Sequence, residues 1–122
     1  MKQYNLIQEK SFDFAVRIVN VYKFLTSEKK EFVLSKQVVK CGTSIGANVE
    51  EAIGAQSKAD FLAKLSISYK EARETNYWIR LLNKTNYLPD NEAENLLSEI
   101  EILKRIIAKI RLTTLSRLQI TN

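Results

Sequence analysis

The chain has 122 residues, of which 45% are hydrophobic, and its 19 Lys and Arg against 14 Asp and Glu give a formal net charge of +5 and a pI near 9.4. This length suits one domain with a single core, while the lone Cys41 excludes an intramolecular disulfide and the absence of histidine removes the commonest metal ligand and acid–base group. The N-terminus MKQYNLIQEK has no apolar signal region, and the longest uncharged run, residues 41–49, is far shorter than the roughly 20 apolar residues of a membrane span, so we expect a cytoplasmic protein with no membrane partner.

Apolar residues recur at spacings of three and four along nearly the whole chain, which predicts amphipathic helices that pack on one side. The first helix is expected to place Phe14 and Ile18 on its core face, with Ser11 or an earlier polar residue as its N-cap. The polar segment SEKKE then forms a turn. The second helix runs from about residue 32 to residue 53, and Gly54 ends it.

The third helix is expected to begin at Ser57, because Ser57 and Asp60 are close to a capping box with Asp in place of the usual Glu. Its core stripe continues for about seven turns, from Phe61 to Leu82. After the segment NKTNYLPD, Asp90 is a candidate N-cap for a fourth helix with a heptad-like apolar seam.

Four amphipathic helices joined by short polar turns predict an all-α fold, an antiparallel up-down-up-down four-helix bundle. No repeat, linker or second domain is visible in the sequence. We therefore expect one domain over residues 1–122, with frayed ends at about 1–7 and 114–122.

All three glycines lie between residues 41 and 54. A phosphate-binding loop would need the pattern GxxxxGK followed by Ser or Thr after a strand, whereas Gly42 and Gly46 are four residues apart within a helical pattern. At about 100° per residue, these two glycines fall at the edge of the core face and make the helix thinner there. A glycine within a helix costs on the order of 1 kcal/mol relative to alanine, so a close contact must compensate, either within the bundle or between subunits.

Five polar residues lie beside the core stripes of the second and third helices: Ser44, Asn48, Glu51, Glu71 and Glu74. Carboxylates that meet inside a four-helix bundle suggest a di-metal site, but such sites use a Glu-x-x-His pair on each of two helices and this chain has no histidine. We therefore expect no metal and no cofactor. The alternative is that these groups satisfy one another, cap neighbouring backbone or line a subunit contact.

Nucleophilic catalysis has equally little support in the sequence. Cys41 is expected to point toward the apolar face of its helix, and neither this thiol nor any serine hydroxyl has a histidine base. We therefore expect that the protein is not an enzyme.

Cations and one aromatic residue share a sector about 80° wide on the third helix, roughly opposite its core stripe. They are Lys70, Arg73, Tyr77, Arg80 and Lys84. Such cations can hold phosphates while the ring stacks on a base. Other cations that face away from the core would extend this surface, namely Lys36 and Lys40 on the second helix and Lys104, Arg105, Lys109 and Arg111 on the fourth. The alternative is an ordinary solvated helix face, with late cations favoured by the helix dipole.

Three stretches carry a family resemblance: SKQVVKCGTSIGANVEEA, AQSKADFLAKLSIS and YKEARETNYWIRLL. They resemble the four-helix-bundle family named after proteins encoded in intervening sequences of bacterial 23S ribosomal RNA genes. The matching positions, in the family's order and spacing, are Thr43, Ser44, Ile45, Asn48, Glu51, Ser57, Phe61, Glu71 and Glu74. The resemblance runs from about residue 11 to the end of the fourth helix.

The resemblance implies a small bundle that assembles into a homopentameric ring. The accessory protein of diversity-generating retroelements is similar in shape, is also basic, and associates with nucleic acid and reverse transcriptase. Five chains of +5 would together carry about +25, which favours RNA or DNA as the partner through counterion release. Family labels that mention ribosomal protein S23 reflect where such genes were found, and we do not predict a structural ribosomal subunit.

A ring needs two different complementary patches on each chain. One candidate is the set of small residues Gly42, Gly46 and Ala47 on the second helix. The other is the face of Trp78, which lies outside both the core stripe and the basic sector of the third helix and is either a wide-core residue or an interface anchor.

The leading hypothesis is a non-enzymatic, oligomeric helical protein that binds RNA or DNA through its basic surface, with weak sequence specificity because no base-reading motif is visible. The alternative is a scaffold whose helices bind a partner protein. A third reading, a metal-dependent bundle enzyme, would need a metal held by Glu51, Glu71 or Glu74.

Overall fold

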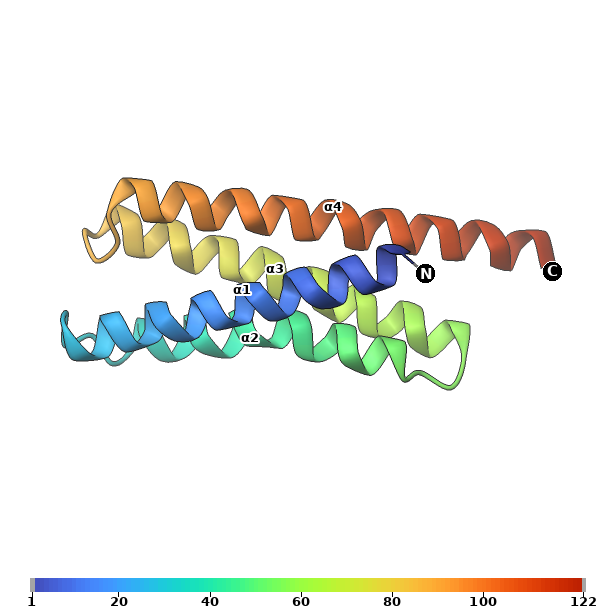
Figure 1. Ribbon diagram of the computed structural model, residues 1–122, viewed down its shortest axis with the longest axis horizontal. Coiled ribbons are helices and arrows are strands. Elements are labelled where there is room, and N and C mark those ends of the chain that lie inside the picture. The colour runs from blue at the N-terminus through green and yellow to red at the C-terminus, as the bar shows by residue number, and fades with distance from the viewer. Residues whose placement is uncertain (1, 122) are drawn as a thin grey trace.

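The computed structural model describes residues 2–121, with side chains for residues 4–117, and contains four helices. They are α1 (Lys2–Ser27), α2 (Leu34–Ile53), α3 (Lys58–Lys84) and α4 (Asp90–Thr121). Figure 1 shows successive helices running in opposite directions, with the α1–α2 and α3–α4 turns at one end and the α2–α3 turn at the other. The prediction of an all-α four-helix bundle is therefore confirmed. Within these residues, no helix combines the length and the apolar character that crossing a bilayer requires.

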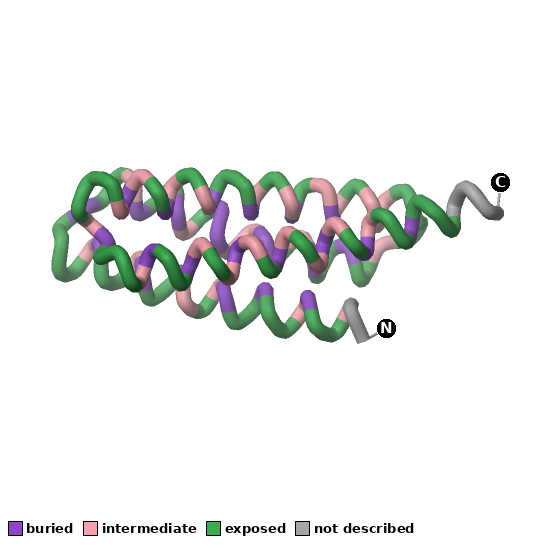
Figure 2. The backbone as a smooth tube through the Cα atoms, turned by 90° about the horizontal axis from the view of Figure 1, so that it is seen from above, coloured by how far each residue is buried: buried purple, intermediate pink, exposed green. Residues whose placement is uncertain are grey.

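Each helix contributes one buried stripe to a common core. Figure 2 shows the buried positions recurring along the inner side of the helices. The spacing-based prediction of this core is confirmed, and it includes two polar residues of α3, Ser68 and Thr75, which are fully buried. The fully buried large side chains are Ile7, Phe14, Ile18, Leu25, Ile45, Leu65, Ile79, Leu82, Leu96, Ile100, Leu103 and Ile107.

The first helix begins well before Ser11, one of the two N-cap alternatives that the sequence suggested. Ser11 lies inside α1, is buried, and donates a hydrogen bond from its hydroxyl to the carbonyl oxygen of Gln8 at 3.2 Å, so its prediction as an N-cap is wrong. The physical reason is that the core stripe already starts at Ile7, which packs in the same cluster as Phe14. In the structure α1 begins at residue 2 and α4 ends at residue 121. The predicted fraying of both ends of the chain stays a prediction.

The carboxylate of Glu31, in the α1–α2 turn, caps the start of α2. It accepts hydrogen bonds from the backbone N–H groups of Val33, Leu34 and Ser35 at 3.2, 3.0 and 2.7 Å, and Ser35 returns one from its hydroxyl to the Glu31 carbonyl oxygen at 2.9 Å. Burial alone would raise the pKa of Glu31, but these backbone donors outweigh it and the pKa is lowered. The three donors are among those that every helix start leaves unpaired.

The predicted N-cap of α3 is confirmed, whereas the predicted N-cap of α4 lies inside that helix. The backbone N–H of Asp60 donates to the hydroxyl oxygen of Ser57 at 3.1 Å, which confirms Ser57 as the N-cap. Asp90 is instead the first residue of α4, because the N–H of Ala93 donates to the carbonyl oxygen of Pro89. The Asp90 carboxylate accepts from the Asn83 amide at 2.8 Å and ties the α3–α4 turn together.

Two of the three glycines let α1 lie close to α2. A Cβ atom at Gly42 would lie 2.7 Å from the Cγ2 atom of Ile18, and one at Gly46 would lie 3.2 Å from the Ser11 carbonyl oxygen. Gly42 is buried by this contact, so its assignment to a subunit contact is corrected, and Gly46 packs against the same helix. The close contact expected to compensate for glycine therefore lies within the chain.

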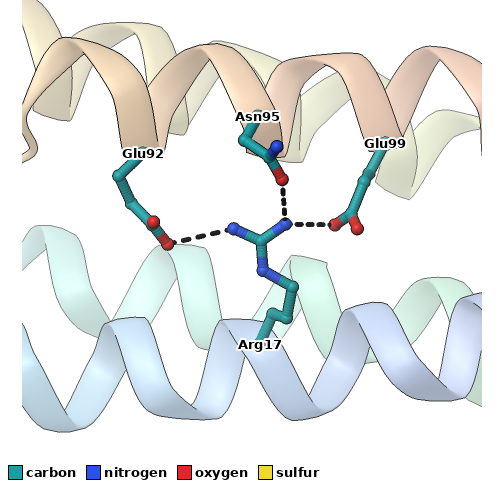
Figure 3. A network of polar contacts seen from close by, with 4 residues as sticks. All are labelled: Arg17, Glu92, Asn95 and Glu99. Atoms are coloured by element: carbon teal, nitrogen blue, oxygen red, sulfur yellow. Dashed lines mark hydrogen bonds and ion pairs between the residues drawn. The ribbon is translucent and has the colours of Figure 1, made fainter.

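The α1–α4 side is the most sparsely packed contact between neighbouring helices, and a polar network bridges it. The guanidinium of Arg17 donates to Glu99 at 2.7 Å and to Glu92 at 3.1 Å, and also to the side-chain oxygen of Asn95 (Figure 3). All three partners lie on consecutive turns of α4. The Arg17 side chain is 28% exposed, so solvent weakens this network, and we assign it an orienting role more than a large share of the stability.

Replacing Glu31 by Ala should lower the free energy of unfolding by about 0.5–2 kcal/mol, as the loss of an N-cap does. Because its pKa is lowered on folding, the Glu31 contribution is present above its ordinary value of 4.5 and is lost as the pH falls through the pKa of the folded protein. Urea unfolding at several pH values should show the gap between the two proteins shrinking in acid. Glu28→Ala, an exposed change in the same turn, is the control. A gap that stays constant down to pH 3 would contradict the carboxylate cap.

Replacing Gly42 by Ala should destabilise the protein by about 1–3 kcal/mol, although alanine is the better helix former. The added Cβ would overlap Ile18, which is fully buried and whose β-branched side chain has little rotamer freedom in a helix. Gly54→Ala is the matched control, because the nearest atoms there are 3.8 and 3.9 Å away and the φ angle of −87° suits alanine. Equal urea midpoints for the two variants would show that α1 and α2 are not held in close contact.

Candidate nucleic-acid interface

The outer surface of α3 carries the predicted group of cations with a tyrosine among them. All five residues are exposed, and Tyr77 is 50% exposed. They follow the helix from its middle to its last residue, on the side opposite the core stripe of Ala72 and Ile79. None of the four cations forms an ion pair with a carboxylate among the described side chains. The members are Lys70, Arg73, Tyr77, Arg80 and Lys84.

Several contacts hold the side chains around Tyr77 in place. The Nε atom of Arg80 donates to the side-chain oxygen of Asn76 at 2.7 Å, and the guanidinium carbon lies 6.0 Å from the centroid of the Tyr77 ring. The Trp78 ring meets the Tyr77 ring edge to face, with centroids 5.0 Å apart. Trp78 in turn donates from its indole N–H to the Glu74 carboxylate at 3.0 Å. The aromatic part of this surface is therefore ordered by the helix itself.

The positive surface continues onto α4 at a residue that the sequence analysis missed. The ring of Tyr69 lies between two cations of α4, with the Lys104 nitrogen 5.8 Å and the Arg111 guanidinium carbon 5.9 Å from its centroid. Tyr69 precedes Lys70 and is partly buried at the α3–α4 contact. The signal in the sequence was only a second tyrosine next to a cation, and its partners depend on how α4 lies against α3. We call the five α3 residues together with Tyr69, Lys104 and Arg111 the basic face.

Four further cations were predicted to extend this surface, two on α2 and two on α4. Burial and the charge of Glu74 raise the pKa of Glu71, and Lys40 of α2 is close enough that its charge opposes this rise. Lys40 thus lies near a carboxylate of α3, and the place of Lys36 in a basic surface stays a prediction. On α4, Arg105 and Lys109 are exposed, as expected. The basic face as defined here extends across α3 and α4, and its extension onto α2 stays a prediction.

The polar residues of the family motif bond mainly to their own helices. The Ser44 hydroxyl donates to the Lys40 carbonyl oxygen at 2.7 Å, and the Asn48 amide donates to the Ser44 carbonyl oxygen at 2.8 Å. Glu51 forms a long ion pair of 3.9 Å with Lys64 of α3. These contacts fit the reading in which such groups bond to neighbouring backbone or to one another. Within the part of the chain that the structure describes, no three His, Cys, Asp or Glu residues come together as a metal site would require.

The remaining candidates for a subunit contact differ in how accessible they are. Ala47 is exposed on the outside of α2. Trp78 is partly buried, packs against the core from the α2 side of α3, and still has its indole N–H bonded to the exposed Glu74. Ala47, Trp78 and the partly buried Gly46 therefore retain exposed surface, whereas Gly42 does not.

Comparisons with known proteins identify similar chains. A family model described as "23S rRNA-intervening sequence protein" matches residues 3–109. A crystal structure of a protein of unknown function from the S23 ribosomal protein family of Bacteroides thetaiotaomicron VPI-5482 is 49% identical, with a TM-score of 0.88; the match covers 89% of this chain and 97% of that one. The comparison with curated proteins found no match.

Cys41 should be unreactive in the folded protein. Burial raises the pKa of its thiol to about 11, and the nearby charges of Glu74 and Glu71 add to this effect. Relative to an ordinary value of 9.0, the thiolate fraction at pH 8 is lower by a factor of about 100. Labelling with iodoacetamide should therefore be slow in buffer and fast in urea, in which the chain unfolds. Native labelling at the urea rate would contradict this and would show an accessible, reactive thiol.

Proposed function

Because the chain belongs to the family of 23S rRNA-intervening sequence proteins, we propose that it is a non-enzymatic, oligomeric helical-bundle protein that binds RNA or DNA through its basic face. The observation that carries this proposal is the absence of carboxylate partners for the cations of α3, whereas Lys104 on the α4 part of the basic face pairs with Glu101 at 3.2 Å. The four cations of α3 are exposed and none of them is paired with a carboxylate among the described side chains. Their charge is available to phosphates, and each phosphate contact releases condensed counterions.

Weak sequence specificity follows from the kind of groups on the basic face. Lysine and arginine on a convex helix reach phosphates, which carry no sequence information. Arg80, the cation best placed by a side-chain hydrogen bond, is held on α3 by Asn76. We therefore propose binding that depends on charge and salt concentration and only weakly on the order of bases.

Assembly would increase this affinity. In the pentamer that the family resemblance implies, five basic faces would act together, and a nucleic acid long enough to reach two of them would bind with a higher effective concentration. The exposed Ala47 on α2 and the partly exposed Trp78 on α3 are the proposed subunit contacts. Ala47 is on α2, and Trp78 is on the side of α3 that faces α2. A subunit contact at these residues would therefore leave the α4 part of the basic face accessible to nucleic acid.

A second function, that of a scaffold for a partner protein, is favoured by a different observation. The outer side of α1 exposes three apolar residues at spacings of four and three: Phe12 at 66%, Val16 at 48% and Val19 at 37%. An apolar stripe on a surface helix is typical of a protein contact. In this alternative the basic face would bind an acidic protein surface.

The proposal is tested by fluorescence anisotropy of labelled single-stranded RNA and duplex DNA across a salt series, with light scattering to count the chains. The variant Lys70→Glu, Arg73→Glu, Arg80→Glu should weaken binding at least tenfold near 0.1 M salt. It should also reduce the slope of log K against log salt by about 3, one for each lost phosphate contact.

The matched control is Lys10→Glu, Lys23→Glu, Lys58→Glu, which makes the same change of charge at exposed sites outside the basic face. If the control weakens binding as much as the test variant, net charge and not the basic face is responsible. If the unchanged protein binds neither nucleic acid even at low salt, the basic face is only solvated and the scaffold function takes its place.

A further inference from the structure

An exposed aromatic ring stands in the middle of the basic face. Tyr77 is 50% exposed, although it lies between cations that need no ring in order to bind phosphates. Next to it is a shallow depression of about 390 Å³, lined by Tyr77, Arg80, Leu81, Asn83 and Lys84. The depression thus has one aromatic and one aliphatic residue among its walls, with two cations beside them. A flat apolar group that carries a negative charge matches this combination.

The two flat groups of the depression are already oriented. Arg80 is fixed by its 2.7 Å hydrogen bond to Asn76 and lies 6.0 Å from the Tyr77 centroid. Tyr77 is held in place by the edge-to-face contact with Trp78. Aromatic rings and guanidinium planes are the two protein surfaces on which unpaired bases stack. Little side-chain entropy would be lost on stacking, because these groups need not be ordered first.

The amide hydrogens of Asn83, the neutral polar residue of the depression, are engaged in the α3–α4 turn. The amide nitrogen of Asn83 donates to the carbonyl oxygen of Leu88 at 3.0 Å and to the Asp90 carboxylate at 2.8 Å, so both of its hydrogens hold the α3–α4 turn. They cannot also read the edge of a base. Lys84, one turn after Arg80, provides a charge for the phosphate of the same or the next nucleotide.

We infer that this depression is a stacking subsite for one unpaired nucleobase, so that the basic face prefers single-stranded nucleic acid to a duplex. The inference rests on the proposed function and specifies single-stranded nucleic acid as the preferred ligand. In a duplex the bases are paired and stacked within the helix, and only the phosphates would reach Lys84 and Arg80. In a single strand a base can turn outward onto Tyr77 while its phosphates keep the same cations.

The test compares Tyr77→Ala and Tyr77→Phe with the unchanged protein on a single-stranded RNA and on a duplex of the same length at one salt concentration. Loss of one stacked base weakens binding by about 5- to 100-fold. Tyr77→Ala should show this loss on the single strand and a change below about twofold on the duplex. Tyr77→Phe keeps the ring and should bind both like the unchanged protein. Because Tyr77 is exposed, both variants are expected to fold, which circular dichroism checks.

A spectroscopic reading separates stacking from a general loss of charge attraction. An RNA with one 2-aminopurine should lose fluorescence when that base stacks on Tyr77, and Tyr77→Ala should remove this quenching. Trp78 is the only tryptophan of the chain and touches Tyr77, so its emission should also change when the single strand binds and not when the duplex does.

The outcomes distinguish the subsite from the function on which it rests. Equal losses on single strand and duplex, or no loss on either, would overturn the stacking subsite, while a salt-dependent affinity that the triple variant abolishes would leave the nucleic-acid proposal standing. If the unchanged protein binds neither substrate, both proposals fail together. A selective loss on the single strand together with loss of the quenching supports the subsite.

Discussion

The close approach of α1 to α2 is the constraint on which the rest of the bundle depends. Gly42 leaves the space that Ile18 fills, and Gly46 brings the helix surface to the backbone of Ser11. With α1 held against α2, its other side packs only sparsely against α4, and Arg17 bridges that gap by polar contacts. The two glycines thus decide where the bundle is tight and where a network of charges must orient its helices.

The packing also sorts the charges of the chain by sign. Glu92 and Glu99 of α4 are engaged by Arg17 on the α1 side, and Glu71 and Glu74 lie on the α2 side of α3. Glu101 of α4 is an exception, because it pairs with Lys104 beside Tyr69 of α3. On the outer surface of α3 lies a row of cations, none of which pairs with a carboxylate among the described side chains.

The contact between α2 and α3 combines buried polar groups with the family motif. The Ser68 hydroxyl donates to the Ile45 carbonyl oxygen at 2.8 Å, and the Thr75 hydroxyl donates to the Glu71 carbonyl oxygen at 2.7 Å, so both buried hydroxyls are satisfied by backbone. Hydroxyls in these places let helix surfaces meet closely without an unpaired polar group. The Ser68 hydroxyl thus joins α3 to the backbone of α2, while the Thr75 hydroxyl bonds within α3.

The sequence by itself determined the number of helices, their core stripes, the Ser57 cap and the cations of α3, because all of these depend on spacing within one helix. It did not reveal the cap by Glu31, the bridge by Arg17 or the place of Tyr69 between cations of α4. It also offered Ser11 as an N-cap although α1 begins at Lys2, since an amphipathic pattern does not by itself mark its first turn. Only the tertiary structure decided these points, because the partners of a side chain on another helix depend on axial position and rotation, which a periodic sequence leaves open.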